Sequence, residues 1–335
     1  MNEALLELTE LKTHFTLREG ILIGRNAGIV KAVDGVSFQL MRGETLGLVG
    51  ESGCGKSTLA RTIVQLERAT SGSINFKGNV LNQLSGREMR AMRTQIQLIF
   101  QDPYASLNPR RTVFDTLAEP MITHHIVERR EVTAEVGRLM EKVGLAKRYL
   151  RKYPHEFSGG QRQRIAIARA LSVKPELVLA DEPVSALDVS VQAQILNLLK
   201  DLCTEDKLTM ILISHDLSVV KHMARRIAVM YLGKIVEIGP AAQVFHTPRH
   251  PYTRALVSAV PVPNPVVEAT RQRVLLKGDP PSPLNPPSGC RFHPRCAYAG
   301  PVCAITEPPL APQEDGSAQA CLRLKELPPW VSGVG

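Results

Sequence analysis

The 335-residue sequence predicts an α/β protein with a doubly covered parallel sheet, followed by a smaller tail of different character. Three observations predict this class. A glycine-rich phosphate-loop motif lies between a strand-like run and a helix-like run. Other short apolar runs alternate with helical stretches, which is typical of parallel sheets covered on both faces. After about Thr247 the composition shifts, and 17 of the 24 prolines lie there, which predicts a tail that is poor in helix.

The composition excludes several classes of protein. Hydrophobic residues make up 44% and charged residues 22% of the chain, as in ordinary globular proteins. The net charge is +9, but aromatic residues are only 4% and the basic residues are spread along the chain, so we expect no nucleic-acid partner. No apolar run is long enough to span a bilayer, and the N-terminus carries acidic residues where a secretion signal carries basic ones. We expect a cytoplasmic protein that works at a membrane only through partners.

The central motif reads GESGCGKST and fits the pattern G-x-x-x-x-G-K-S/T. A strand-length run, Thr45–Val49, precedes it, and residues 59–67 read as a helix, so a turn that binds nothing is the weaker interpretation. Glycines let the backbone amides point inward, and the helix start adds its positive dipole end. Lys56 is expected to reach the β- and γ-phosphates of ATP, and Ser57 to bind Mg²⁺. The predicted nucleotide-binding residues of the loop are Gly50, Glu51, Ser52, Gly53, Cys54, Gly55, Lys56, Ser57 and Thr58.

The other elements follow from apolar patterning. The expected strands are Leu5–Leu11, Val30–Leu40, Ser71–Phe76, Gln95–Phe100, Leu177–Ala180 and Thr209–Ser214. Helices are expected at Glu131–Val143 and Val189–Leu202, within or after a helical subdomain at about 104–165. A domain boundary is expected near Phe245–Arg249, giving residues 1–246 and 247–335.

Polar residues at the ends of the predicted strands supply the expected catalytic groups. Asp181 ends the apolar run LVLAD and would contact Mg²⁺, which Gln101 would also approach, and Glu182 would orient or deprotonate the attacking water. Gln101 follows one strand, and His215 follows another, so each could sense the γ-phosphate. Taken alone, two carboxylates, a Gln or a His at a strand end are more often surface or capping residues. After a phosphate loop they form a consistent set.

A second glycine-rich helix start lies at Ser158, Gly159, Gly160 and Gln161, in the sequence FSGGQRQR. It is a second anion-binding site by the same dipole argument. One active site does not need two phosphate cradles, so the second is expected to close over a nucleotide held by another subunit.

These motifs, in this order, resemble the ATP-binding subunits of ABC transporters, which share a P-loop, RecA-like core. The resemblance covers about residues 5–245 and includes the SALD stretch ending at Asp188, which it implies is a nucleotide-binding residue. It implies a head-to-tail dimer with two ATP molecules, each between Lys56 of one subunit and Ser158 of the other. Phe15 falls where the family places an aromatic residue that stacks on adenine, although this chain has no Tyr there.

The tail narrows the resemblance. PRHPYTRAL (Pro248–Leu256) and GDPPSPLNPPSGCRFHPRC (Gly278–Cys296) are similar to the C-terminal extension of dipeptide and oligopeptide importer ATPases. Within that class, the stretches VKAVDGVSF (residues 30–38) and QDPYASLNPR (residues 101–110) resemble the second ATPase subunit. This implies ATP-driven peptide import at the cytoplasmic face of the inner membrane. The implied partners are a sister ATPase subunit, two permease subunits and a periplasmic peptide-binding protein. Another cargo, such as nickel or haem, a soluble ABC ATPase, and a small-molecule P-loop kinase are the alternatives.

Four of the six cysteines lie in the tail, at Cys290, Cys296, Cys303 and Cys321. A reducing cytoplasm disfavours disulfides, and four thiolates in a core-poor segment favour a metal staple. A 4Fe–4S cluster is favoured, and the resembling importers are implicated in carrying one; zinc, with His293 as an optional ligand, and free thiols stay open. Cys54 and Cys203 are expected to be ordinary small residues, with Cys54 a possible target of thiol reagents.

Overall fold

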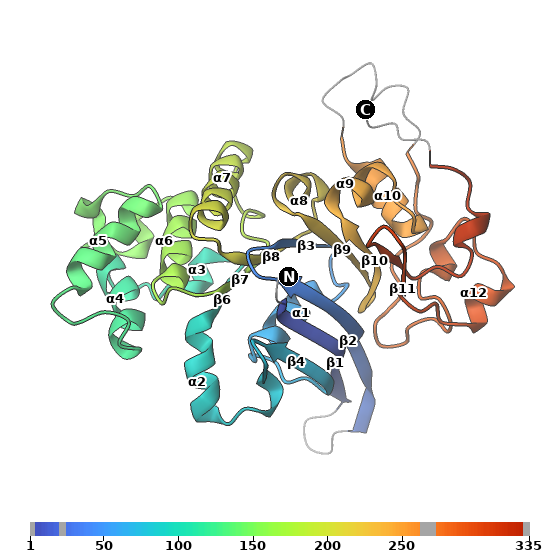
Figure 1. Ribbon diagram of the computed structural model, residues 1–335, viewed down its shortest axis with the longest axis horizontal. Helices are drawn as coiled ribbons and strands as arrows, with labels where there is room; N and C mark the ends of the chain where they lie inside the picture. Colours follow the sequence, from blue (N-terminus) through green and yellow to red (C-terminus); the bar gives the residue numbers. More distant parts are fainter. Residues whose placement is uncertain (1–3, 20–24, 262–272, 331–335) are drawn as a thin grey trace. The chain divides into compact units, whose positions relative to one another are not determined.

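The computed structural model describes residues 4–19, 25–261 and 273–330. These residues form two compact units, whose elements are shown in Figure 1. We call the first the helical unit; its described residues are Met41–Thr45 and Gln83–Ile213. We call the second the P-loop unit; it contains Ala4–Leu40, Leu46–Asn82 and Ser214–Gly335.

The helical unit is built on three parallel strands. β6 (Ile96–Ile99) pairs with β7 (Leu177–Asp181), and β7 pairs with β8 (Thr209–Ser214). Every residue of β7 and β8 is buried, as expected for strands covered on both faces. The predicted parallel arrangement is therefore confirmed for these strands, and their predicted ends are right to within one residue.

Helices make up most of the rest of this unit, between and after the strands. Ser85 and Thr112 begin two of them through capping boxes with the carboxylates of Glu88 and Asp115, which satisfies backbone amides at both helix starts. The elements are α2 (Gly86–Gln95), α3 (Pro103–Ser106), α4 (Val113–Thr123), α5 (Val132–Lys142), the 3-10 turns Lys147–Tyr149 and Pro154–Glu156, α6 (Gly159–Leu171) and α7 (Val189–Glu205).

The P-loop unit contains strands in the order β11-β12-β10-β9-β3. β3 (Thr45–Val49) is parallel to β9 (Arg226–Tyr231), but β10 (Lys234–Pro240) is antiparallel to β9. The expectation of an all-parallel sheet is therefore wrong here. The cause is the two-residue turn Leu232–Gly233, where both φ angles are positive (45° and 82°), as a tight type I′ hairpin requires.

A separate antiparallel sheet in this unit has the order β2-β1-β4-β5, which also departs from the expected parallel fold. The predicted strand at Leu5–Leu11 is the start of a much longer one. The strands of this antiparallel sheet are β1 (Ala4–Glu19), β2 (Arg25–Met41), β4 (Ser71–Phe76) and β5 (Asn79–Val80). The 3-10 turn Leu81–Gln83 follows β5. Helix α1 (Lys56–Ile63) begins and ends earlier than the predicted residues 59–67. It ends earlier because Gln65 has a left-handed φ of 57°, and an α-helix cannot continue through this conformation.

The tail belongs to the sheet of the P-loop unit. β12 pairs with β10 through Glu237↔Gln319, and the Ala320 N–H donates to the Val236 carbonyl at 2.8 Å. In the described part of the tail, helix is scarce after the first element, α10, as predicted. The elements from Ser214 onward, apart from β9 and β10, are α8 (Leu217–Met223), α9 (Ala241–His246), α10 (Pro251–Ala259), the 3-10 turns His293–Arg295 and Leu324–Glu326, α12 (Pro301–Ile305), β11 (Ala311–Pro312) and β12 (Ala318–Gln319).

Three buried aromatic rings join β9, α10 and the tail. The ring centroid of Tyr231 lies 4.7 Å from that of Tyr252 and 5.2 Å from that of Phe292, and the Tyr252 and Phe292 centroids are 5.4 Å apart. All three side chains are almost completely buried. Tilted and edge-on pairs of this kind contribute about 0.5–1.5 kcal/mol each beyond their burial. The cysteine-bearing tail is thus fixed to the strand next to β3, which leads into the phosphate loop.

Candidate nucleotide site

The glycine-rich loop closes on Lys56, the first residue of α1. Its Nζ donates hydrogen bonds to the backbone oxygens of Gly50 at 2.7 Å and Glu51 at 2.9 Å, and the residue is only 4% exposed. Gly55 has a φ of 108°, and a Cβ there would lie 2.0 Å from the carbonyl oxygen of Ala32. Glycine is therefore required at this position on conformational and steric grounds. The result is a buried ammonium group held at a helix start.

The start of α1 has the properties of a phosphate site. Gly55 is the N-cap and provides no side-chain acceptor, and the first turn contains no acidic residue. The backbone N–H groups of this turn and the positive end of the helix dipole therefore favour an anion. Ser57 and Thr58 add partly exposed hydroxyl groups to the same turn. The loop fits the phosphates of ATP, and Ser57 fits as a hydroxyl ligand of Mg²⁺.

Cys54 lies inside this loop but does not have the properties of a reactive thiol. It is 5% exposed, its Sγ lies 3.8 Å from Lys56 Nζ, and burial raises its pKa despite the nearby ammonium. Since the thiolate is the reactive form, the structure argues against the expected sensitivity to thiol reagents. It supports the expectation of a small packing residue.

In the helical unit, the carboxyl end of β7 brings two predicted catalytic residues together. Gln101 Nε2 donates to Glu182 Oε2 at 3.0 Å and lies 3.4 Å from Ser185 Oγ. Glu182 has a left-handed φ of 45°, and its N–H donates to the Ile213 carbonyl at 3.0 Å. A residue other than glycine in this conformation is strained, and such strain is concentrated at functional sites. Asp181, the residue before it, is buried.

The second predicted anion site is the start of α6. Ser158 Oγ accepts a hydrogen bond from the Gln161 N–H at 3.4 Å, and Gln161 Oε1 accepts one from the Ser158 N–H at 3.1 Å. Gly160 serves packing, because a Cβ there would lie 2.4 Å from Val191 Cγ1 of α7. At Gly159 the nearest atom, Leu187 Cδ2, is 3.3 Å away. Packing against α7 therefore requires a glycine at position 160, whereas position 159 has more room for a side chain.

Three other predicted residues lie at element ends or on the surface. Asp188 is the N-cap residue of α7 and makes no side-chain cap hydrogen bond. His215 follows β8 and is exposed, and Phe15 on β1 is 36% exposed. That these residues share one site with Lys56 and Asp181 stays a prediction.

The tail contacts the phosphate loop, which the sequence did not lead us to expect. Arg295 Nη1 and Nη2 donate to the two carboxylate oxygens of Glu51 at 2.8 and 3.2 Å. The Glu51 N–H donates to Tyr252 Oη at 2.9 Å. The sequence separations are 244 and 201 residues, and no local pattern signals either contact.

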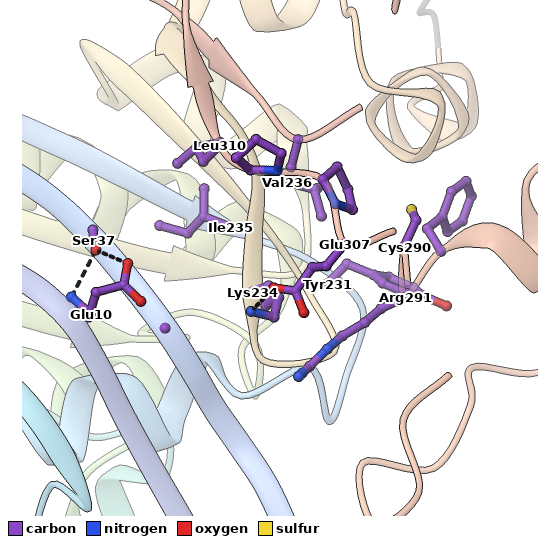
Figure 2. A pocket seen from close by; sticks show the side chains of 15 residues that line it. Glu10, Ser37, Tyr231, Lys234, Ile235, Val236, Cys290, Arg291, Glu307 and Leu310 are labelled. Carbon is purple, nitrogen blue, oxygen red and sulfur yellow. Dashed lines mark hydrogen bonds and ion pairs between the residues drawn. The ribbon is translucent and has the colours of Figure 1, made fainter. Parts of the chain in front are cut away.

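The P-loop unit also contains a pocket of about 410 Å³ (Figure 2). Cys290, Arg291 and Tyr231 line it, together with the ion pair between Lys234 Nζ and Glu307 Oε1 at 2.5 Å. Arg291 also donates to the carboxylate of Asp34. Burial raises the pKa of Asp34, but His14 and Arg291 outweigh it and hold that pKa below its usual range.

None of the four tail cysteines takes part in a disulfide bond. The Cys290 N–H donates to the Cys303 carbonyl at 2.8 Å. Burial raises the pKa of Cys290 to about 11; a hydrogen bond with the Phe292 backbone opposes this rise, and repulsion from Cys296, Cys303 and Cys321 adds to it. The thiols therefore lie within electrostatic range of one another. Among the described residues, however, no group of three or more His, Cys, Asp or Glu side chains is arranged to hold a metal ion.

The comparisons with known proteins agree with this geometry. The family model for ABC transporters matches residues 33–185, and the model for the oligopeptide/dipeptide transporter C-terminal region matches residues 236–303. The chain resembles the solved ATP-binding cassette MJ0796, a dimer bound to ADP and Pi in a post-hydrolysis state. The two are 28% identical with a TM-score of 0.63, over 70% of this chain and 98% of that one. The fold and the loop define a P-loop ATPase of the ABC transporter class.

Curated relatives identify the branch. The oligopeptide transport ATP-binding protein AppF of Bacillus subtilis is 54% identical over 90% of this chain and 92% of its own length. OppF of Escherichia coli is 52% identical over 97% of this chain and 98% of its own length. The dipeptide transport protein DppF of Haemophilus influenzae is 48% identical over 96% of this chain and 98% of its own length. The chain belongs to the family of oligopeptide and dipeptide transport ATP-binding proteins. No helix in the described part of the chain is both long and apolar enough to span a membrane.

Proposed function

We propose that this chain hydrolyses ATP to drive the import of dipeptides and other short peptides through a membrane permease. The observation that carries the hydrolytic part is the 3.0 Å hydrogen bond from Gln101 to Glu182. It joins a residue suited to sense the γ-phosphate to a carboxylate suited to activate water. The peptide cargo is proposed from the names of the relatives and from the matched C-terminal region.

Each step of hydrolysis has a residue suited to it. Lys56 and the amides of the loop bind the phosphates. Ser57 and Asp181 would hold Mg²⁺, which would supply positive charge to the phosphate oxygens. Glu182 accepts a proton from the attacking water. Gln101 holds the Glu182 carboxylate in position and senses the γ-phosphate. His215 donates a hydrogen bond to the γ-phosphate, and Phe15 stacks on adenine.

The second helix start completes the site in a dimer. In this proposal Ser158, Gly159 and Gly160 of one subunit close over the ATP held by Lys56 of another, and Asp188 contributes to nucleotide binding. The other subunit is a sister ATPase, and ATP binding closes the pair while hydrolysis reopens it. Two permease subunits and a periplasmic peptide-binding protein form the rest of the importer. The chain then works at the cytoplasmic face of the inner membrane.

The helices that follow Gln101 are suited to transmit this cycle. They belong to the helical subdomain at about residues 104–165 and lie mainly between Gln101, the γ-phosphate sensor, and the Ser158 helix start. In the proposed dimer this segment connects the ATP of its own subunit to the ATP of the other subunit, so it moves when the dimer closes. We propose that it docks the permease.

We further propose that Cys290, Cys296, Cys303 and Cys321 hold a 4Fe–4S cluster. The donor set fits, since four thiolates ligate such a cluster. The proposal is carried by this donor set; among the described residues, no group of three or more His, Cys, Asp or Glu side chains is arranged around a metal ion. Iron and sulfide analysis after anaerobic purification tests this, with Cys296→Ser as the depleted variant. Stoichiometric zinc without sulfide would overturn it.

Glu182→Gln tests the hydrolytic assignment. It keeps the hydrogen-bonding shape but removes the base, so turnover should fall by roughly 10²–10⁴-fold while ATP binding persists. Glu141→Gln in the same unit removes a carboxylate that pairs with Lys147 on the surface, and it should leave turnover unchanged. Normal hydrolysis by Glu182→Gln would remove Glu182 from the catalytic role.

The cargo needs a transport measurement. The complete transporter, reconstituted with its permease and binding protein, should take up labelled di- and oligopeptides in an ATP-dependent manner. The same vesicles offered nickel or haem should show no ATP-dependent uptake. The reverse result would assign the chain to a transporter of another solute and leave its ATPase activity in place.

A further inference from the structure

Arg295 and Glu51 form a buried, two-pronged ion pair between the tail and the phosphate loop. Both guanidinium Nη atoms contact the carboxylate, and the side chains are 7% and 26% exposed. Planar fork-to-fork pairing fixes direction as well as distance. A pair this well shielded is screened much less by solvent than a surface pair. This pairing fixes both the position and the orientation of the Glu51 carboxylate.

Tyr252 holds the same residue by its backbone. It is fully buried and accepts the Glu51 N–H at 2.9 Å. The sequence around it explains how: His250 Nδ1 accepts the Tyr252 N–H at 3.1 Å and begins α10, and the His250 N–H donates to Glu237 at 2.9 Å. The PRHPYTRAL stretch therefore fixes a tyrosine against the loop.

The same residue is linked to the phosphate-binding lysine, because Lys56 Nζ donates to the Glu51 carbonyl. Glu51 is thus held at three points: its side chain by Arg295, its N–H by Tyr252 and its carbonyl by Lys56. Two of these three partners lie after residue 247, in the tail.

We propose that Arg295 and Tyr252 are positioning residues for nucleotide binding, through which the tail sets the conformation of the phosphate loop in the same chain. Neither residue is assigned contact with ATP. The proposal rests on the ATP-binding part of the proposed function, and on neither the cargo nor the cluster. It gives the tail a role in the nucleotide site itself.

The test is Arg295→Gln in the full chain, with ATP affinity measured by equilibrium binding and KM and kcat measured in the reconstituted transporter. We expect the Kd and KM for ATP to rise by roughly tenfold or more, since small displacements of binding groups have effects of this size, while kcat changes little. Arg295→Lys, which keeps the charge, should recover part of the affinity. Tyr252→Phe keeps the packing and should raise KM by a smaller factor.

Arg249→Gln is the matched control. It removes the same charge from the tail and breaks an ion pair with Asp315, which does not involve the loop, so KM should not change. Unchanged Kd and KM in Arg295→Gln would overturn the proposal, and Lys56→Ala measured beside it shows whether the loop binds ATP at all.

A double-mutant cycle keeps the test valid if Arg295→Gln alone proves unstable. Glu51→Gln with Arg295→Gln leaves two neutral amides that can hydrogen-bond, with no buried unpaired charge. Coupled residues give a double variant no worse than the more damaging single variant. Losses in ATP affinity that simply add would show that the two residues act independently and would overturn the proposal.

Discussion

Helices α1 and α6 both begin with glycine-rich sequence, yet their starts are built differently. At α1 no side chain caps the first turn, and the buried Lys56 lies beside it. At α6 the side chain of Ser158 caps the helix and Gln161 completes a reciprocal capping box. The start of α1 leaves its backbone amides available to a ligand. At the start of α6, side chains of the same chain satisfy some of the backbone amides.

The other capping boxes sharpen this contrast. Helices α2 and α4 place carboxylates, Glu88 and Asp115, at the third helical position, where α6 has the neutral Gln161. A carboxylate there strengthens a cap through the helix dipole, but it repels an approaching phosphate. The start of α6 is thus a cap that an anion can still approach. This is what the proposed dimer requires, because ATP reaches this helix only when the subunits close.

The largest effect is expected at the uncapped start. Lys56→Ala removes the only side-chain cation in the first turn of α1, so ATP binding and hydrolysis should both fall, by roughly 10²–10³-fold or more. Fluorescent ATP-analogue binding and phosphate release measure the two losses. Arg61→Ala, at the last turn of the same helix, is the control and should retain both activities. Wild-type affinity in Lys56→Ala would contradict the assignment of α1 as the phosphate site.

A smaller effect is expected at the capped start. Gln161→Glu recreates the box seen at α2 and α4, so the melting temperature should be kept or raised. Hydrolysis should fall by about tenfold, because a carboxylate then faces the γ-phosphate. ATP binding by the isolated chain, measured in the same preparation, should not change. Full activity in Gln161→Glu would break the contrast between the two starts and count against the proposed dimer.

Stability should respond at Gly160 more than at Gly159. The Cβ of Gly160→Ala would lie 2.4 Å from Val191 Cγ1, so overpacking should cost about 1–3 kcal/mol in the free energy of unfolding. Gly159→Ala, where the nearest atom is 3.3 Å away, should cost less. Urea unfolding measures both. Val191→Ala added to Gly160→Ala should restore stability, and a failure to do so would place the cause elsewhere.

The parts of the candidate site that we predicted from the sequence are those whose residues lie close together in the chain. The phosphate loop, the paired carboxylates after Leu177–Ala180 and the Ser158 helix start each place chemistry and its structural context within about ten residues. The structure adds that Gln101 contacts Glu182, as expected of two strand ends in neighbouring parallel strands.

The missed features depend on residues far apart in the chain. Arg295 could have been assigned to the surface like most arginines, and only the fold shows that it meets Glu51. The β9–β10 hairpin was missed because its turn uses Leu232 with a positive φ of 45° in place of the usual Asn or Asp. Gly233 is a turn residue, but leucine carries no turn signal, so only one of the two turn positions was marked in the sequence.

The smallest expected effect concerns a third helix start, that of α10, which is capped by a titratable side chain. Burial lowers the pKa of His250 to about 3 from an ordinary 6.5, so below pH 6.5 the unfolded chain binds a proton that the folded chain does not. Stability should therefore fall as the pH drops from about 6.5 toward 3. His250→Asn keeps an acceptor for the Tyr252 N–H but does not titrate, so it should lose less stability between pH 7 and pH 5 in urea unfolding. His246→Asn, an exposed histidine on α9, should keep the wild-type acid loss. If the free energy of unfolding depended on pH in the same way in all three proteins, protonation of His250 would not contribute to the loss of stability. The cap would then have only a structural role.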